Sequence, residues 1–272
     1  MPTYALLGAT GSTGSAIVRS LLKDPPKDLT LNIFIRSKSK LLKTFPDLET
    51  ATAFKANIIE GVPSDTTALQ TCLKDATVIF GCIGTNEPTA GMTLIHDTIT
   101  SIISALQHRR EVEGSAYQTP TVIQLRSSSL NPNSTLPQFS RSMAWFFFYH
   151  IYTDLDKGCN LLISNSSSKD STTTSPQLLD YIFVDPPSIH DADGTETTGH
   201  KLFTDMSKET QEPAISYADL GAAFCEVAQR RKEFAGQGVF VSATGKVRMT
   251  WGPLMGFMRK GLWSRVAGFK PV

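Results

Sequence analysis

Three glycines near the start of the chain are spaced so that they could hold a phosphate group. They stand at Gly8, Gly11 and Gly14 in the stretch "YALLGATGSTGSAIV". An apolar run precedes them and a helical pattern follows, which is the context of a strand, a turn and a helix that bind a dinucleotide. In such a site the first glycine makes the turn, the second lets a pyrophosphate approach the backbone, and the third lets the helix pack against the strand. The alternative is a glycine-rich turn in some other unit of strand and helix.

The other residues of the glycine motif and the end of the second strand indicate how the nucleotide is bound and which nucleotide it is. We expect Thr10, Ser12 and Thr13 to lie beside the phosphates, because they stand between the glycines. The second strand ends in "FIRSKSK", where Arg36 occupies the place at which NAD sites usually carry an acidic residue. A guanidinium can hold a 2′-phosphate with two hydrogen bonds. The sequence therefore favours NADP(H) over NAD(H), with a solvated basic turn as the alternative.

Two further strand ends are expected to contact the cofactor, because ligands of such sheets lie outside the carboxyl ends of the strands. The stretch "KANI" would place Asn57 and Ile58 beside the adenine. The stretch "GCIGT" would place Cys82, Ile83 and Gly84 under the pyrophosphate and the ribose. For both stretches, ordinary strand packing is the alternative.

Strands that alternate with helices would position these residues, and the chain shows that pattern. Short β-type runs end near residues 8, 36, 58, 84, 127 and 187. Helical stretches long enough to cross between strands lie at 12–23, 64–73, 91–106 and 141–164. This alternation predicts an α/β fold of the Rossmann type, with a doubly wound, mainly parallel sheet covered on both faces.

The regular alternation of strands and helices ends after Pro187. A polar loop, a helix from Tyr217 to about Arg231, a short strand in "GVFVSA" and an apolar tail follow. We expect residues 1–272 to form a single NAD(P)-binding domain, to which about 188–272 contribute a small C-terminal substrate lobe. The Ser/Thr-rich segment 164–177 has too little apolar surface to fold alone, so a solvated loop is predicted there.

Composition and charge narrow the classes of partner. Of the 272 residues 40% are hydrophobic, which is enough for a sizeable core. The 26 basic and 25 acidic residues leave a formal charge of +1, so we expect a small-molecule substrate and no nucleic acid. The four cysteines show no ligand spacing, which argues against a metal site or a disulfide framework. No leader and no long apolar run is visible, so a cytoplasmic protein without integral membrane association is expected.

A family resemblance is carried by motifs at several strand ends. "GATGSTG" with Arg36, "GCIGT", "RSSS", "VDPPSI" and the later "ISYADLGAAF" resemble the atypical short-chain dehydrogenase/reductases. Within them the chain is similar to the NAD(P)H-binding branch of NmrA-like proteins, biliverdin reductase B and reductase-like proteins of fungal secondary metabolism. The similarity extends from the N-terminus to about residue 230. It implies a Rossmann fold, bound NADP(H) and a substrate pocket over the nicotinamide.

The catalytic pair usual in that superfamily, a tyrosine followed four residues later by a lysine, is missing. The residues four after Tyr149 and Tyr152 are Thr153 and Asp156. Lys157 follows Tyr152 by five residues, which places it about 140° away around a helix. It falls near a lysine that the biliverdin reductase branch carries on the same helix, so the resemblance implies a catalytic or cofactor-binding role for Lys157. Tyr152 is a candidate proton donor.

Serines and prolines at the last two strand ends supply further candidates. Ser127 matches the family's serine position and Ser128 follows it. A hydroxyl there could bind the nicotinamide amide or orient a substrate carbonyl. The alternative is that these serines only finish a strand and start a turn. Pro186 and Pro187 are expected to shape the backbone beside the nicotinamide.

Two aromatic segments leave several interpretations open. The run 145–149, with Tyr152, has more ring surface than one helix face can bury. A core helix accounts for part of it, and a substrate pocket or a dimer interface for the rest. The tail 251–262 has apolar residues at helical spacing, which fits a lid, a homodimer contact or a peripheral membrane contact.

Three classes of function follow from these patterns. The favoured one is an NADPH-dependent reductase of a small aromatic or conjugated carbonyl or quinone-type metabolite, because a dinucleotide motif accompanies an aromatic-rich segment. The second is a nonredox isomerase, dehydratase or cyclase on the same scaffold. The missing Tyr–Lys pair supports this class. The third is an NmrA-like NADP(H) redox sensor, although the sequence identifies no protein partner for it.

Overall fold

The computed structural model describes all residues of the chain except 86, 167–176, 191–194, 250 and 268–272. Within the described residues the main sheet has eight strands. The strand order is β3-β2-β1-β4-β5-β6-β10-β8, and every neighbouring pair is parallel except β10 with β8. The α/β fold with a doubly wound, mainly parallel sheet is therefore confirmed. The strands are β1 (Thr3–Leu7), β2 (Thr30–Ile35), β3 (Lys55–Glu60), β4 (Val78–Gly81), β5 (Thr121–Leu125), β6 (Asp180–Asp185), β8 (His200–Phe203) and β10 (Gly238–Ala243).

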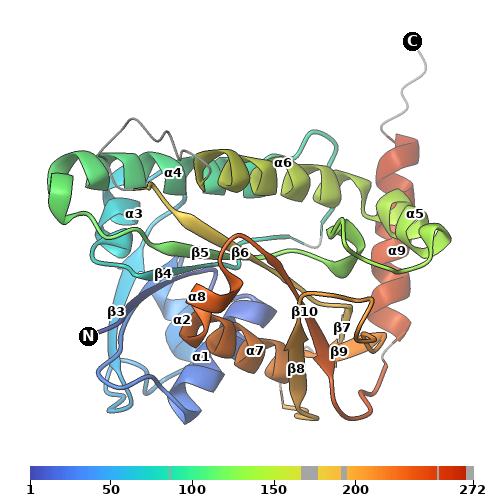
Figure 1. Cartoon of the computed structure of the whole chain (residues 1–272), viewed down its shortest axis with the longest axis horizontal. Helices are drawn as coiled ribbons and strands as arrows, with labels where there is room; N and C mark the ends of the chain where they lie inside the picture. Colours follow the sequence, from blue (N-terminus) through green and yellow to red (C-terminus); the bar gives the residue numbers. More distant parts are fainter. Residues whose placement is uncertain (86, 167–176, 191–194, 250, 268–272) are drawn as a thin grey trace.

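Helices cover both faces of this sheet (Figure 1). Helices α1 and α7 pack together on one face, and α3, α4 and α6 lie on the other. None of the helices in the described part of the chain is long and apolar enough to cross a membrane. The helices are α1 (Ser12–Lys23), α2 (Lys38–Thr44), α3 (Thr66–Leu73), α4 (Leu94–Glu113), α5 (Gln138–Phe147), α6 (Tyr149–Ser166), α7 (Tyr217–Gln229), α8 (Arg231–Phe234) and α9 (Trp251–Ala267), with short 3-10 turns at Gly114–Ala116 and Ser128–Leu130.

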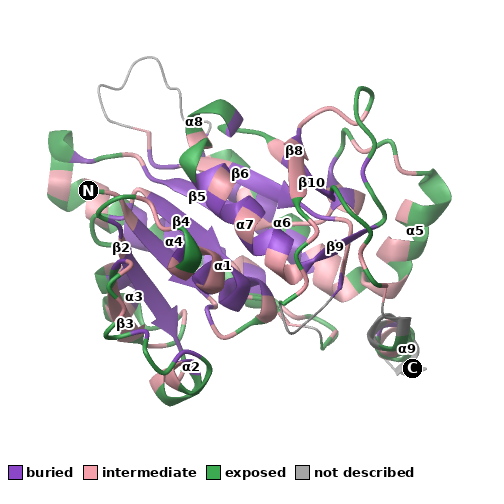
Figure 2. Cartoon of the chain, turned by 90° about the horizontal axis from the view of Figure 1, so that it is seen from below, coloured by how far each residue is buried: buried purple, intermediate pink, exposed green. Residues whose placement is uncertain are grey.

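The core lies in two layers, one on each face of the sheet. Successive residues of β1 point to opposite faces. Tyr4 and Leu6 join the apolar cluster under α1 and α7, and Ala5 and Leu7 join the cluster under α3, α4 and α6. The central strands are therefore buried on both sides, as the purple strands in Figure 2 show. This is the burial expected of a parallel sheet with helices on both faces.

Several element boundaries differ from the sequence-based expectation. The stretch 141–164 forms two helices, α5 and α6, which are separated at Phe148. Strand β3 continues to Glu60, two residues beyond its predicted end. The loop predicted for 164–177 lies mostly outside the described residues, although α6 extends to Ser166.

The segment after Pro187 contributes to more than one part of the molecule. Strands β8 and β10 extend the main sheet, and α7 packs on α1. Strands β7 (Ser188–His190) and β9 (Ala214–Ser216) form a separate parallel pair. Helix α9 packs beside α5 at one end of the molecule (Figure 1). A substrate lobe in this segment stays a prediction.

Candidate active site

The glycine turn after β1 has the close contacts that the spacing predicts. Gly8 has a φ of +95°, a conformation that side chains rarely adopt, and a Cβ there would lie 2.7 Å from the carbonyl oxygen of Cys82. A Cβ on Gly14 would collide with the carbonyl oxygen of Gly8. Helix α1 can therefore start directly against the turn only because both positions lack a side chain.

The N-terminus of α1 fits a phosphate. Gly11 precedes the helix without a side-chain cap, and the first turn carries no acidic residue. The first backbone N–H groups of a helix have no partner within it, and the helix dipole makes this end positive. Gly11, Ser12 and Thr13 line a large cavity, while Thr10 lies in the turn outside its lining. On the facing loop, a Cβ on Gly84 would meet nothing within 4 Å, so a ligand can approach that backbone closely.

This cavity has a volume of about 950 Å³ and lies where the strand order reverses between β1 and β4. Ligands of doubly wound sheets bind at this switch point, outside the carboxyl ends of the strands. The expected site residues that line the cavity are Gly11, Ser12, Thr13, Cys82, Ile83, Gly84, Ser127, Ser128, Tyr152, Pro186 and Pro187. Residues that follow β1, β4, β5 and β6 and residues of α5 and α6 therefore line the same cavity.

Two hydroxyl groups come together inside the cavity. The hydroxyl oxygen of Ser127 lies 3.1 Å from the phenol oxygen of Tyr152. The Tyr152 ring packs edge-on against Trp145 and tilted against Phe148, with centroid distances of 5.8 and 5.6 Å. Burial raises the pKa of Tyr152, while hydrogen bonds to Ser127 and Ser129 oppose this shift. The phenol therefore keeps its proton at neutral pH and can donate it in a hydrogen bond.

Lys157 does not lie with Tyr152. Its side chain is exposed on α6 and is absent from the lining of the cavity. The buried face of α6 instead carries Leu155, Cys159 and Leu162, which pack in the core beneath the helix. A step of five residues turns the side chain about 140° away from Tyr152. The structure therefore does not bring Lys157 together with Tyr152, and its expected contact with the cofactor or substrate stays a prediction.

A buried ion pair at the ends of β5 and β6 was missed by the sequence reasoning. Arg126 donates two hydrogen bonds to the Asp185 carboxylate, at 2.7 and 2.6 Å, and Asn131 donates a third at 2.7 Å. Asp185 is fully buried, which raises the pKa of its carboxyl group, whereas the bonds from Arg126 lower it. The guanidinium also lies 4.4 Å from the ring centroid of Phe183.

This ion pair fixes the backbone on which the site is built. Arg126 directly precedes Ser127, and Asp185 directly precedes Pro186. Opposite charges at the ends of neighbouring parallel strands were the sequence signal for the pair, because such ends meet at one edge of a sheet. The two strand ends are therefore held together where they enter the cavity.

The residues expected to select and hold the adenine end lie outside the cavity. Arg36 is exposed directly after β2, and the structure shows no carboxylate paired with it in the described residues. Asn57 lies inside β3, where its amide donates a 2.8 Å hydrogen bond to the side chain of Asn32. Ile58 packs against the apolar core. Because β3 continues to Glu60, Asn57 and Ile58 lie within the strand and not at its end, and their expected contact with the adenine stays a prediction.

The remaining wall of the cavity is apolar and partly aromatic. Phe139, Met143 and Ala144 of α5, with Phe148, line one side. Cys82 lies on another side, and burial raises the pKa of its thiol, so it stays protonated at neutral pH. Ser188 and Ile189 of β7 and the two residues before β9, Glu212 and Pro213, also line the cavity. Ser188 Oγ lies 3.0 Å from Nε2 of the buried His190.

Known proteins match the chain over most of its length. A family model described as NAD(P)H-binding matches residues 8–231. Averufin oxidase A of Dothistroma septosporum is 48% identical over 97% of this chain and 92% of its own length. Averufin oxidase A of Aspergillus flavus is 44% identical over 96% of this chain and 89% of its own length. A protein of Aspergillus novofumigatus named oxidoreductase nsrR is 31% identical, covering 94% and 92% of the two chains.

Solved structures share the fold at low sequence identity. A wide-type short-chain dehydrogenase/reductase from Veillonella parvula in complex with NADP has a TM-score of 0.62 at 18% identity, covering 90% of this chain and 95% of that one. L-Sorbose reductase from Gluconobacter frateurii with NADPH and L-sorbose has a TM-score of 0.57 at 12% identity, covering 92% and 97%. The chain therefore belongs to the NAD(P)H-binding family and is an oxidoreductase, and its fold is shared with short-chain dehydrogenase/reductases.

Proposed function

We propose that this protein is an NADPH-dependent reductase of a small aromatic or conjugated carbonyl or quinone-type metabolite, and that it works in secondary metabolism. One observation carries the proposal. The turn suited to a pyrophosphate and the Ser127–Tyr152 hydroxyl pair open into the same largely apolar cavity. The relatives named averufin oxidase support oxidoreductase chemistry and make averufin the first compound to test.

Residues along one side of the cavity would hold the cofactor. Gly11, Ser12 and Thr13 at the start of α1 would bind the pyrophosphate, and Gly84 would let it approach the opposite backbone. Pro186 and Pro187 would lie beside the nicotinamide. When bound, NADPH supplies the hydride that the reduction needs.

The side chains of the protein would act on the substrate oxygen. Ser127 and Tyr152 would donate hydrogen bonds to the carbonyl oxygen as negative charge develops on it. Tyr152 is suited to this role, because burial raises the pKa of its phenol and keeps the proton in place. The apolar side chains of Phe139, Met143 and Phe148 would pack against the rings of the substrate and exclude water.

The preference for NADPH is expected to depend on Arg36. Replacing Arg36 by alanine should weaken NADPH binding about tenfold to hundredfold, because a charge-assisted contact to the 2′-phosphate is lost. NADH, which lacks that phosphate, should bind the variant as it binds the wild type. The measurement is a titration of both proteins with each nucleotide, followed by nicotinamide fluorescence. Lys40→Ala, an exposed charge change on the adjacent α2, is the control. Equal losses for NADPH and NADH would contradict this role of Arg36.

The reaction is tested by following the hydride itself. NADPH deuterated at the transferable position is incubated with the protein and with averufin or a series of quinones and conjugated ketones. A reductase should form one reduced product for each NADPH consumed, and the product of a conjugated ketone should carry one deuterium on carbon. The hydroquinone formed from a quinone exchanges its hydroxyl hydrogens with water, so the quinones are followed by NADPH consumption alone. Turnover that continues without any nicotinamide would contradict the proposal and favour an isomerase, dehydratase or cyclase.

A further inference from the structure

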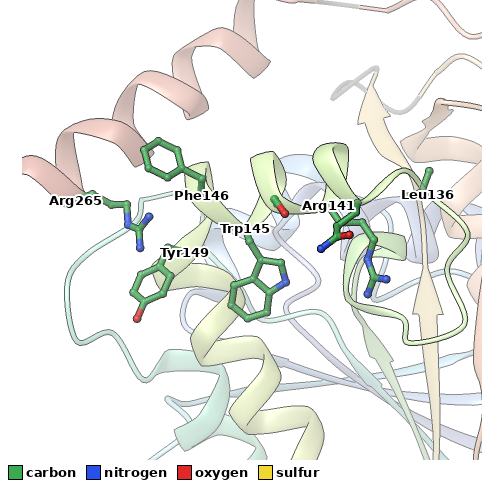
Figure 3. A pocket seen from close by; sticks show the side chains of 8 residues that line it. Leu136, Arg141, Trp145, Phe146, Tyr149 and Arg265 are labelled. Atoms are coloured by element: carbon green, nitrogen blue, oxygen red, sulfur yellow. The ribbon is translucent and has the colours of Figure 1, made fainter.

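We propose that a second cavity, on the outer side of α5, is a binding site for a planar aromatic carboxylate. The cavity has a volume of about 660 Å³ and is formed by α5, the start of α6 and α9 (Figure 3). Its lining includes Arg141, Trp145, Phe146, Tyr149 and Arg265. Of its lining residues only Leu136 also lines the active-site cavity, so the proposal does not rest on the proposed function.

The helical spacing of α5 explains how one aromatic segment serves two cavities. Residues four apart lie on the same face of a helix. Arg141 and Trp145 follow this step on α5 and face the outer cavity, as Tyr149 does at the start of α6, whereas Phe139 and Met143 face the active site. The outer rings are not core residues, since Phe146 and Tyr149 are 40% and 39% exposed and α5 has no buried residue. In Figure 2 the ribbon of α5 accordingly shows no purple.

A close helix contact builds the other wall of the outer cavity. Gly261 of α9 is buried, and a Cβ on it would collide with the carbonyl oxygen of Phe147. The glycine therefore lets α9 approach the end of α5. Arg265 follows one turn later, and its guanidinium lies 5.0 Å from the ring centroid of Phe146 and 4.3 Å from that of Tyr149. Figure 3 shows this guanidinium beside the two rings.

The charges of the outer cavity are all positive. Its lining contains two guanidinium groups and no carboxylate. Arg141 donates to the carbonyl oxygens of Ser129 and Asn131, at 3.2 and 3.4 Å, which anchors it to the turn after Ser127. Arg265 has no carboxylate partner within the described part of the chain. A carboxylate on the ligand would therefore form an ion pair with the Arg265 guanidinium.

The rings of the outer cavity select for a flat ligand. In Figure 3 the indole of Trp145 lies between the guanidinium groups of Arg141 and Arg265. A planar ring system can pack on Trp145 and Tyr149 while its carboxylate pairs with Arg265. An aliphatic acid would satisfy the charge and leave these rings uncovered, and a neutral aromatic ligand would cover the rings and leave the charge unpaired. The combination favours an aromatic acid over either.

The test uses 2-naphthoate as the probe and its uncharged amide, 2-naphthamide, as the ligand control. Binding of each to the wild type, Arg265→Gln and Arg259→Gln is measured by isothermal titration calorimetry. Arg259 is an exposed arginine of the same helix outside the cavity lining, so it is the matched control. Arg265→Gln should weaken naphthoate binding about tenfold or more, and Arg259→Gln should leave it unchanged. The weaker binding of naphthamide should not respond to either change.

Two further measurements separate this site from the active site and from a loss of structure. Saturating NADPH should not displace naphthoate from the wild type. Arg265→Lys, which keeps the positive charge, should retain most of the binding that Arg265→Gln loses, at an equal melting temperature. Absence of naphthoate binding to the wild type, equal affinity in Arg265→Gln, or full displacement by NADPH would each overturn the proposal.

Discussion

Replacing Tyr152 by phenylalanine is expected to lower kcat about 10²- to 10⁴-fold while the affinity for NADPH stays close to that of the wild type. The phenol lies 3.1 Å from Ser127 Oγ in the cavity, and no lysine accompanies it there. Phenylalanine keeps the ring contacts with Trp145 and Phe148 but removes the hydroxyl that would donate to the substrate oxygen. A loss of this size is typical of a group that acts on a proton in the transition state. Steady-state kinetics with a substrate from the hydride-transfer screen give the measurement.

Two companion variants make the Tyr152 result specific. Ser127→Ala should lower kcat as well, and the double variant should lose less than the product of the two single effects, because the hydroxyls act as one pair. Tyr149→Phe removes a phenol from the same helix that does not line the active-site cavity, so kcat should not change. An unchanged kcat in Tyr152→Phe, or an equal loss in Tyr149→Phe, would contradict the role assigned to Tyr152.

Replacing Asp185 by asparagine is expected to destabilise the protein by about 3 to 5 kcal/mol. This change leaves the Arg126 guanidinium, whose side chain is 9% exposed, without its charged partner. Breaking a buried ion pair from one side typically costs this much, because an uncompensated charge stays in the interior. The free energy of unfolding is measured by urea denaturation of the wild type and the variant.

An exposed ion pair supplies the control for Asp185. Lys38 and Glu49 lie 2.7 Å apart, with side chains that are 44% and 48% exposed. Glu49→Gln should therefore change the free energy of unfolding by less than about 1 kcal/mol. Combining Asp185→Asn with Arg126→Met should recover part of the stability lost in the single variant, since the orphaned charge is removed. A loss in Asp185→Asn no larger than that in Glu49→Gln would contradict the structural role of the pair.

The first unit of strand and helix could be predicted from the sequence in detail. The apolar run to Leu7 and the glycine spacing place the turn, and α1 spans 12–23 as expected. Local contacts determine the structure of this turn, because a side chain at Gly8 or Gly14 would collide with nearby backbone atoms. The alternation of short apolar runs with helical stretches was enough to predict the parallel sheet, which has the expected strands and crossover helices.

Other features depend on contacts that the sequence alone does not show. No glycine or proline marks the break at Phe148, so a single helix was predicted where α5 and α6 meet. Strand β3 is longer than the stretch "KANI" indicates, because Ile59 and Glu60 also pair with β2. The Arg126–Asp185 pair joins residues 59 positions apart, and only the neighbouring order of β5 and β6 brings them together. The role of Lys157 rests on the resemblance alone, since its step of five residues from Tyr152 places the two side chains on different sides of α6.

The affinity of Gly84→Val for NADPH, measured beside its melting temperature, is the most direct test of whether the cavity holds the cofactor. A Cβ at Gly84 meets nothing within 4 Å and the position lines the cavity, so valine should fit the free protein without loss of stability. The added methyl groups would occupy the space through which a dinucleotide approaches the backbone. The melting temperature of Gly84→Val should stay unchanged while NADPH binding weakens roughly tenfold or more, and Gly84→Ala should show a smaller loss of affinity. Wild-type NADPH affinity in a folded Gly84→Val variant would contradict binding of the cofactor in this cavity.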